Sequence, residues 1–182
     1  MARIPGIDPA TLTPEQKRIH DEIVSGPRGK VEGPLRVWLT SAGLADRAQA
    51  LGAFCRYGTS LPQRLSELAI LVTGAYWQAG FEWSVHAPIG VAAGLDPAAV
   101  ENIRVGVDPG LTSEDERAVY AFSRELLTTR RVSEATYAFA ERVLGRRALV
   151  DLVGVLGYYG LISMTINAFE VPVPPGDPEP FG

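Results

Sequence analysis

The chain has 182 residues, of which 46% are hydrophobic and 21% are charged, a composition typical of one soluble globular domain. A net charge of −4 without a basic stripe argues against a nucleic-acid partner. The single cysteine excludes an intrachain disulfide and a Cys-x-x-Cys pair. We therefore expect a single cytoplasmic domain over residues 1–182.

Helix caps mark the chain from its first segment onward. Thr13-Pro14-Glu15-Gln16 combines an N-cap, a proline at the first helical position and a capping-box glutamine, and this helix is expected to reach about Ser25. Residues 27–34 are expected to form a glycine- and proline-bearing loop that closes an N-terminal extension over 1–32. The further helices are expected over about 35–40, 44–57, 61–79, 81–93, 97–105, 113–130 (after a cap at Thr112 or Ser113), 133–145 and 147–169.

A proline-rich tail over 170–182 follows the last helix and is expected to be extended or disordered. No stretch alternates apolar and polar residues in a way that predicts a strand. The pattern therefore predicts an all-α fold.

One uncharged stretch, Leu152–Phe169, is long enough to raise the question of a membrane span. It contains polar residues and three glycines, Gly154, Gly157 and Gly160. We interpret it as a buried helix that packs closely through these glycines, inside the fold or at a subunit interface. A transmembrane helix is the less favoured alternative.

The segment 67–86 gathers ionisable and aromatic residues in an apolar stretch. Glu82 and His86 are four residues apart and therefore share one helix face. Because histidine titrates near neutral pH, His86 beside Glu82 and Glu67 predicts a proton-transfer site. The alternatives are a core histidine that only satisfies Glu82, and an exposed ion pair between Glu67 and Arg64.

Other residues are candidates for binding a substrate. Arg56 and Arg64 flank the turn before the Glu67 helix and are expected to hold a carboxylate, with Trp83 and Tyr158 as pocket residues. The alternatives are salt-bridged arginines and core aromatics. Glu67, Glu82 and His86 also resemble a metal-ligand set, but a second nearby histidine is lacking, so neither metal nor cofactor is expected.

Three stretches carry a family resemblance. They are RLSELAILV…W…FEWSVHAPIGVAAGL in the centre, GPLRVWLTSAGLADRAQALGAFCRYGTSLPQRLSELAILV ahead of it, and LVDLVGVLGYYGLISMTINAFEVPVP near the end. Together they cover most of residues 30–174 and resemble the carboxymuconolactone decarboxylase family, which is related to the alkylhydroperoxidase AhpD proteins. The resemblance implies an AhpD-like helical subunit with its site between helices, in a homo-oligomer such as a trimer or hexamer.

The chain departs from the redox branch of that superfamily. AhpD-type peroxidases place a Cys-x-x-Cys pair ahead of a histidine, and a glutamate on the preceding helix. The glutamate and histidine match Glu67 and His86, whereas the two cysteine positions fall on Ala79 and Glu82. A peroxidase would need a reactive thiolate, and Cys55 stands alone on an earlier helix.

The motif Glu82-Trp83-x-x-His86 of this chain resembles the corresponding segment of the decarboxylase branch. It implies a cofactor-independent lyase that releases CO₂ from a small carboxylated lactone or a related intermediate of aromatic degradation. In this interpretation His86 delivers or removes the proton, and Glu82 and Glu67 orient the imidazole or share the proton. The alternatives are a hydroperoxide reductase and a non-catalytic, small-molecule-binding oligomer. A small carboxylate or lactone is the expected partner, with neither nucleic acid nor membrane.

Overall fold

The structure, a computed structural model, describes residues 2–4 and 7–182, and these residues include helices but no strand. A short 3₁₀ turn, η1 (Pro9–Thr11), precedes nine α-helices in this part of the chain. The helices are α1 Pro14–Ser25, α2 Pro34–Trp38, α3 Ala42–Tyr57, α4 Gln63–Trp77, α5 Gly80–Ala92, α6 Pro97–Val105, α7 Glu114–Thr129, α8 Glu134–Leu144 and α9 Arg146–Phe169. The all-α prediction is therefore confirmed.

Local capping explains where several helices begin. The Thr13 N–H donates to Gln16 Oε1 at 2.9 Å and the Gln16 N–H donates to Thr13 Oγ1 at 3.3 Å, which is the predicted capping box. Asp96 caps α6 by accepting from the Ala98 N–H at 2.9 Å, and Ser133 caps α8 in the same way. These side chains satisfy backbone donors that a first helical turn leaves free.

The turn between α4 and α5 differs from the prediction. We expected the helix to reach Ala79 and break at Gly80, but α4 ends at Trp77, and Gln78 reverses the chain with a left-handed φ of 50°. Gly80 is instead the first residue of α5, where a Cβ would collide with the carboxylate of Glu179. The missing side chain of Gly80 thus leaves room for the Glu179 carboxylate of the tail.

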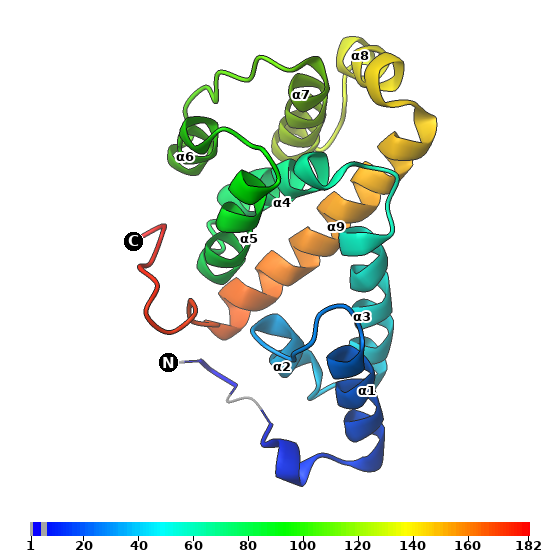
Figure 1. Cartoon of the computed structure of the whole chain (residues 1–182), viewed down its shortest axis with the longest axis vertical. Coiled ribbons are helices and arrows are strands. Elements are labelled where there is room, and N and C mark those ends of the chain that lie inside the picture. The colour runs from blue at the N-terminus through cyan, green and yellow to red at the C-terminus, as the bar shows by residue number, and fades with distance from the viewer. Residues whose placement is uncertain (1, 5–6) are drawn as a thin grey trace.

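α4 occupies the centre of the molecule, where it packs against α5, α7 and α9 (Figure 1). All of its residues from Leu65 to Gly74 are buried, so its surface is covered on every side. Glu67 lies in this run and is only 2% exposed. The alternative of an exposed ion pair between Glu67 and Arg64 is therefore wrong.

α9 crosses the molecule diagonally beside α4 and reaches from α8 to α2 (Figure 1). It is long and apolar enough to span a membrane by length and composition, but 67% of its apolar window is buried inside the fold. It packs against α3, α4, α5 and α8. The helix thus has the burial of a core helix.

The glycines of α9 pack differently from the prediction. A Cβ at Gly154 or Gly157 would meet open space, whereas one at Gly160 would lie 3.9 Å from the indole nitrogen of Trp77. Close packing inside the subunit is therefore wrong for the first two glycines. They belong to one exposed side of the helix, here called the α9 open face. It consists of Val150, Val153, Gly154, Gly157, Leu161 and Met164.

The proline-rich tail folds back along α5 without forming a helix or strand. Phe181 makes a T-shaped contact with Trp83, with ring centroids 5.5 Å apart. Arg104 of α6 donates to the carbonyl of Pro180. The tail is therefore attached near its end to the helix that carries Glu82 and His86.

Candidate functional site

Three ionisable side chains meet inside the hairpin formed by α4 and α5. Glu67 comes from α4, whereas Glu82 and His86 lie one turn apart on α5. Glu67 Oε2 lies 2.7 Å from His86 Nδ1, and Glu82 Oε1 lies 3.1 Å from His86 Nε2. All three residues are buried, with at most 4% of their surface exposed. The residues expected to be catalytic thus form one buried chain, Glu67–His86–Glu82.

Small residues allow the two helices to approach one another around this chain. A Cβ at Gly90 of α5 would lie 3.1 Å from Leu71 Cδ1 and 3.6 Å from Glu67 Cβ. A Cβ at Gly74 of α4 would lie 3.6 Å from Glu82 Cγ. The methylene groups of each glutamate therefore pack beside a glycine of the facing helix, and both carboxylates lie within reach of the imidazole.

The two contacts of the imidazole are not equivalent. The Glu67 contact is a hydrogen bond, and an ionised carboxylate only accepts, so Nδ1 carries the proton when Glu67 is ionised. Nε2 then faces Glu82, but the geometry is not aligned for a hydrogen bond. Glu82 Oε1 is buried and has no hydrogen-bond donor among the described residues. This oxygen can therefore exchange a proton with Nε2 or with a ligand.

Burial controls the charge of Glu82. It raises the pKa of this carboxyl group above its ordinary value of 4.5, an effect that the charge of His86 opposes and the charge of Glu67 reinforces. A carboxyl group of this kind keeps its proton at a higher pH than an exposed glutamate. Glu82 is therefore suited to act as a proton donor.

Two tyrosines of α9 pack beside the site. Tyr159 makes a T-shaped contact with the His86 ring at 5.2 Å, and Tyr158 packs against Tyr159 at the same centroid distance. The Tyr158 hydroxyl accepts a hydrogen bond from Arg28 at 3.2 Å. Burial raises the pKa of Tyr158 to about 12 and that of Tyr159 well above 10, so both rings stay neutral.

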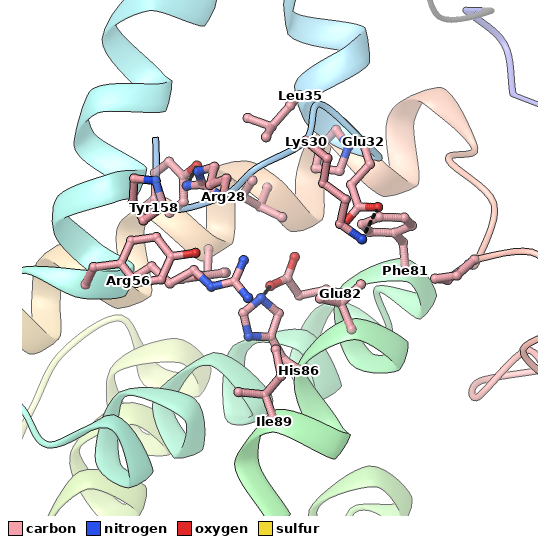
Figure 2. Close-up of a pocket in the computed structure, with 17 residues that line it drawn as sticks. Arg28, Lys30, Glu32, Leu35, Arg56, Phe81, Glu82, His86, Ile89 and Tyr158 are labelled. Carbon is pink, nitrogen blue, oxygen red and sulfur yellow. Dashed lines mark hydrogen bonds and ion pairs between the residues drawn. The ribbon is translucent and has the colours of Figure 1, made fainter. Parts of the chain in front are cut away.

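A cavity of about 440 Å³ opens beside Glu82 and His86 (Figure 2). Its walls come from α3, α5, α9 and the loop between α1 and α2. Glu67 lies behind the imidazole and does not line the cavity. The polar and aromatic residues of the wall, besides Glu82 and His86, are Arg28, Lys30, Glu32, Arg56, Tyr57, Phe81, Tyr158 and Tyr159.

Two of these residues bring positive charge to the cavity. Arg56 stands at the end of α3, as expected for a substrate-binding residue, and its guanidinium lies beside Glu82 (Figure 2). Arg28 comes from the loop, and the sequence interpretation missed it because no local pattern tells which loop side chain turns inward. Neither guanidinium forms an ion pair with a carboxylate of the described residues.

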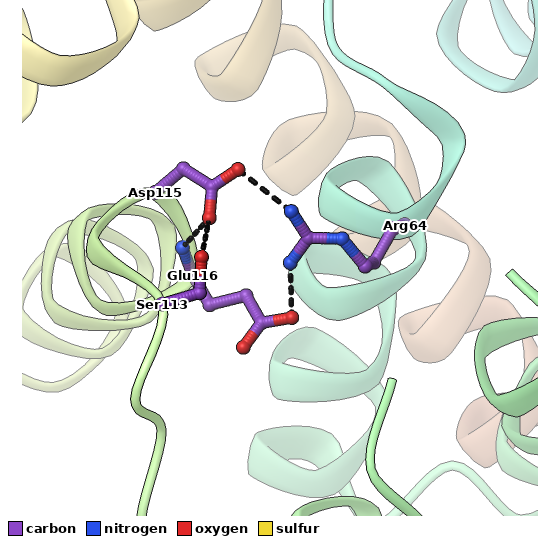
Figure 3. Close-up of polar contacts among 4 residues, drawn as sticks. All are labelled: Arg64, Ser113, Asp115 and Glu116. Carbon is purple, nitrogen blue, oxygen red and sulfur yellow. Dashed lines mark hydrogen bonds and ion pairs between the residues drawn. The ribbon is translucent and has the colours of Figure 1, made fainter. Parts of the chain in front are cut away.

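Two further residues that we expected at the site lie elsewhere. The Arg64 guanidinium binds Asp115 at 2.7 Å and also Glu116, and thereby joins α4 to α7 outside the cavity (Figure 3). Trp83 points away from the cavity and packs against Phe181 of the tail. Arg64 is thus a structural ion-pair residue, and Trp83 a packing residue.

Cys55 does not offer a reactive thiolate. Its side chain is fully buried, and burial raises the pKa of the thiol to about 11, with a further contribution from the charge of Asp151. Cys55 also does not line the cavity. The surroundings of the thiol are those of a small apolar core residue.

The donor geometry differs from that of a metal site. Glu67 and Glu82 approach different nitrogens of the imidazole, so their oxygens lie on separate sides of the ring rather than around one shared point. Within residues 2–4 and 7–182, no group of three or more histidine, cysteine or acidic residues is placed to hold an ion. The arrangement is instead a linear one, in which the imidazole lies between the two carboxylates and is hydrogen-bonded to Glu67 alone.

No protein-family model and no curated protein matches this chain. Several solved structures match its fold. An uncharacterized peroxidase-related protein from Silicibacter sp. TM1040 gives a TM-score of 0.77 at 15% identity, over 96% of this chain and 92% of that one. A peroxidase-related protein with an alkylhydroperoxidase AhpD core, from Ralstonia eutropha JMP134, gives 0.77 at 15% identity, over 96% and 93%.

An enzyme appears among these matches as well. The debrominase Bmp8, as a cysteine-to-alanine variant in complex with 2,3,4-tribromopyrrole, gives a TM-score of 0.74 at 13% identity, over 96% of this chain and 95% of that one. At such identities the likeness concerns the fold alone. The chain therefore has the all-α fold of AhpD-like, peroxidase-related proteins.

Proposed function

We propose that this protein is a cofactor-independent lyase that releases CO₂ from a small carboxylated lactone or a related aromatic-degradation intermediate. The observation that carries the proposal is the buried Glu67–His86–Glu82 chain, whose Glu82 end opens into a cavity containing two arginines without ion-pair partners. Arg28 and Arg56 attract an anionic substrate. The fully buried Cys55 speaks against a hydroperoxide reductase.

The proposed reaction balances without a co-reactant. The substrate carboxylate leaves as CO₂, and the electron pair of the broken C–C bond passes into the conjugated lactone as a dienolate, whose charge the arginines stabilise. Protonated Glu82 delivers its proton to the carbon, and His86, oriented by Glu67, returns a proton from solvent to Glu82. The sum is R–COO⁻ + H⁺ → R–H + CO₂.

The test is CO₂ release by the purified protein from a panel of small carboxylated lactones. We expect Glu82→Gln and His86→Asn each to lower kcat by about 100-fold or more, because each removes the proton-transfer group. Glu67→Gln should lower kcat less, since it alters only the orientation of the imidazole. Glu134→Gln, on an exposed residue at the start of α8, is the matched control and should leave kcat unchanged.

Three outcomes would contradict the proposal. The first is full CO₂ release by both Glu82→Gln and His86→Asn. The second is hydroperoxide consumption with a thiol reductant that Cys55→Ser abolishes, which would establish the peroxidase alternative. The third is tight binding of lactones without any turnover, which would establish a binding protein.

A further inference from the structure

A second cavity adjoins the first. It has a volume of about 360 Å³ and lies between the loop after α1, the start of α2 and the tail. Its walls are largely apolar and include Val31, Val37, Val171 and Val173, with Arg36 and Glu32 as the charged residues. The proposed acid–base reaction uses none of these residues.

The two cavities share three wall residues, Glu32, Phe81 and Pro174. Phe81 immediately precedes Glu82 on α5. Its ring rests on the backbone of Gly33, where φ is 52° and a Cβ would collide with the ring. Phe81 is therefore the aromatic part of the partition between the cavities, and its partly buried ring is supported by a glycine.

The charged end of the first cavity lies away from this partition. In Figure 2, Arg56 and Phe81 appear on opposite sides of Glu82. Lys30, near Phe81, is neutralised by Glu32 at 2.8 Å, whereas Arg28 and Arg56 have no acidic partner among the described residues. A ligand that lies across Glu82 therefore has its anionic end at the arginines and its other end toward Phe81.

We propose that the ligand of this site is an amphiphilic monocarboxylate. Its carboxylate binds Arg28 and Arg56, and its apolar substituent passes Phe81 into the second cavity. This inference rests on the proposed function for the position of the carboxylate and deepens it by naming the substrate class. Apolar walls favour such a substituent because its burial removes hydrocarbon surface from water.

The test is calorimetric binding of butanoate, hexanoate and octanoate to the purified full chain. We expect the affinity to rise with each added methylene, by up to about fourfold when it is fully buried. Val173→Trp fills the second cavity from the half-buried tail and should remove this gain while leaving butanoate affinity unchanged. Arg56→Gln should weaken all three acids. Val107→Trp, on an exposed residue that lines neither cavity, is the matched control.

Equal affinities for the three acids would overturn the inference, as would an equal effect of Val173→Trp on butanoate and octanoate. Octanol that binds as tightly as octanoate would also overturn it, because the arginines would then contribute nothing. Binding is measured without turnover. An affinity that rises with chain length, without CO₂ release from lactones, would therefore contradict the proposed reaction and support the substrate class. CO₂ release from lactones with an affinity independent of chain length would support the reaction and contradict the substrate class.

Discussion

Glu82 lies in surroundings that a carboxylate does not favour. A carboxylate in water has several hydrogen-bond donors, but the Oε1 atom of Glu82 is buried and has none among the described residues. The two nearby arginines act on it only through their charge. The natural response of such a group is to stay protonated, which costs stability at high pH and provides an acid for chemistry.

The pH dependence of stability should reveal this cost. As the pH rises above 4.5, Glu82 ionises in the unfolded chain but stays protonated in the folded protein, so the folded state binds more protons. The stability of the wild type relative to Glu82→Gln should therefore fall, by at most about 1.4 kcal/mol per pH unit, until the pH reaches the raised pKa. Urea unfolding between pH 4 and 8 measures this, and a pH-independent difference would contradict the shift.

The thiol of Cys55 should be unreactive in the folded protein. With a pKa of about 11, only about one thiol in 10,000 is ionised at pH 7, and the side chain is fully buried. A chromogenic disulfide reagent should react with it at pH 7 only after denaturant is added, and Cys55→Ala should leave lyase activity unchanged. Rapid labelling of the native protein would show that the thiol is accessible after all.

At the scale of elements, the α4–α5 hairpin contains the site, and Arg64 links this hairpin to α7 through ion pairs. Its guanidinium binds two neighbouring carboxylates of α7, and all three side chains are at most one-third exposed. Removing the cation would break both pairs and leave Asp115 and Glu116 as adjacent negative charges. Arg64 thus stabilises the packing of α4 against α7, whereas Arg56, at the end of α3, faces the cavity.

The two arginines should therefore separate experimentally. Arg64→Met should lower the free energy of unfolding by about 2 kcal/mol, because partly buried charge-assisted bonds are lost, with little change in kcat/KM at temperatures where the variant is folded. Arg56→Met should do the opposite and raise KM while leaving stability nearly unchanged. Chemical denaturation measures the change in unfolding free energy of both variants, and steady-state kinetics measures the change in KM. A KM effect from Arg64→Met would return this residue to the substrate site.

At the scale of the molecule, the α9 open face is apolar, with Val150 73% exposed and both glycines facing open space. We propose that this face is the contact surface of the homo-oligomer that the family resemblance leads us to expect. Gly157→Glu should then convert the oligomer to a monomer in light-scattering chromatography, since the open space leaves the subunit fold intact. Val107→Asp, on an exposed residue elsewhere, is the control. Unchanged assembly by Gly157→Glu would assign the contact to another surface.

Local chemistry made much of the fold predictable. Side chains such as Thr13 and Asp96 bond to their own helix starts, so the signal lies within four residues of the cap. The Glu82–His86 pair is likewise local, because helix geometry places residues four apart on one face. Glu67 lies in the same apolar segment and matches the glutamate of the family resemblance, but no short-range rule predicts that it contacts His86 from another helix.

The predictions that were wrong or missing concern residues whose roles depend on long-range packing. Arg56 and Arg64 are similar in sequence context, and their roles differ only because α7 presents two carboxylates to one of them. Arg28 reaches the cavity from an irregular loop and bonds to a tyrosine 130 positions away. Gly80 resembles a helix breaker until the tail, nearly a hundred residues later, is seen to lie against it. A single sequence holds no local signal for such pairings.

The covered run of α4 from Leu65 to Gly74 also bears on how the protein is made. A short helix that is apolar on all sides is not stable alone in water, because its stability comes from tertiary packing. α4 is therefore expected to form only as α5, α7 and α9 pack around it. Its amide protons should then exchange with solvent only when the whole chain unfolds. Because Glu67 sits in this run, the orientation of His86 depends on complete folding, and a partly folded intermediate would be inactive.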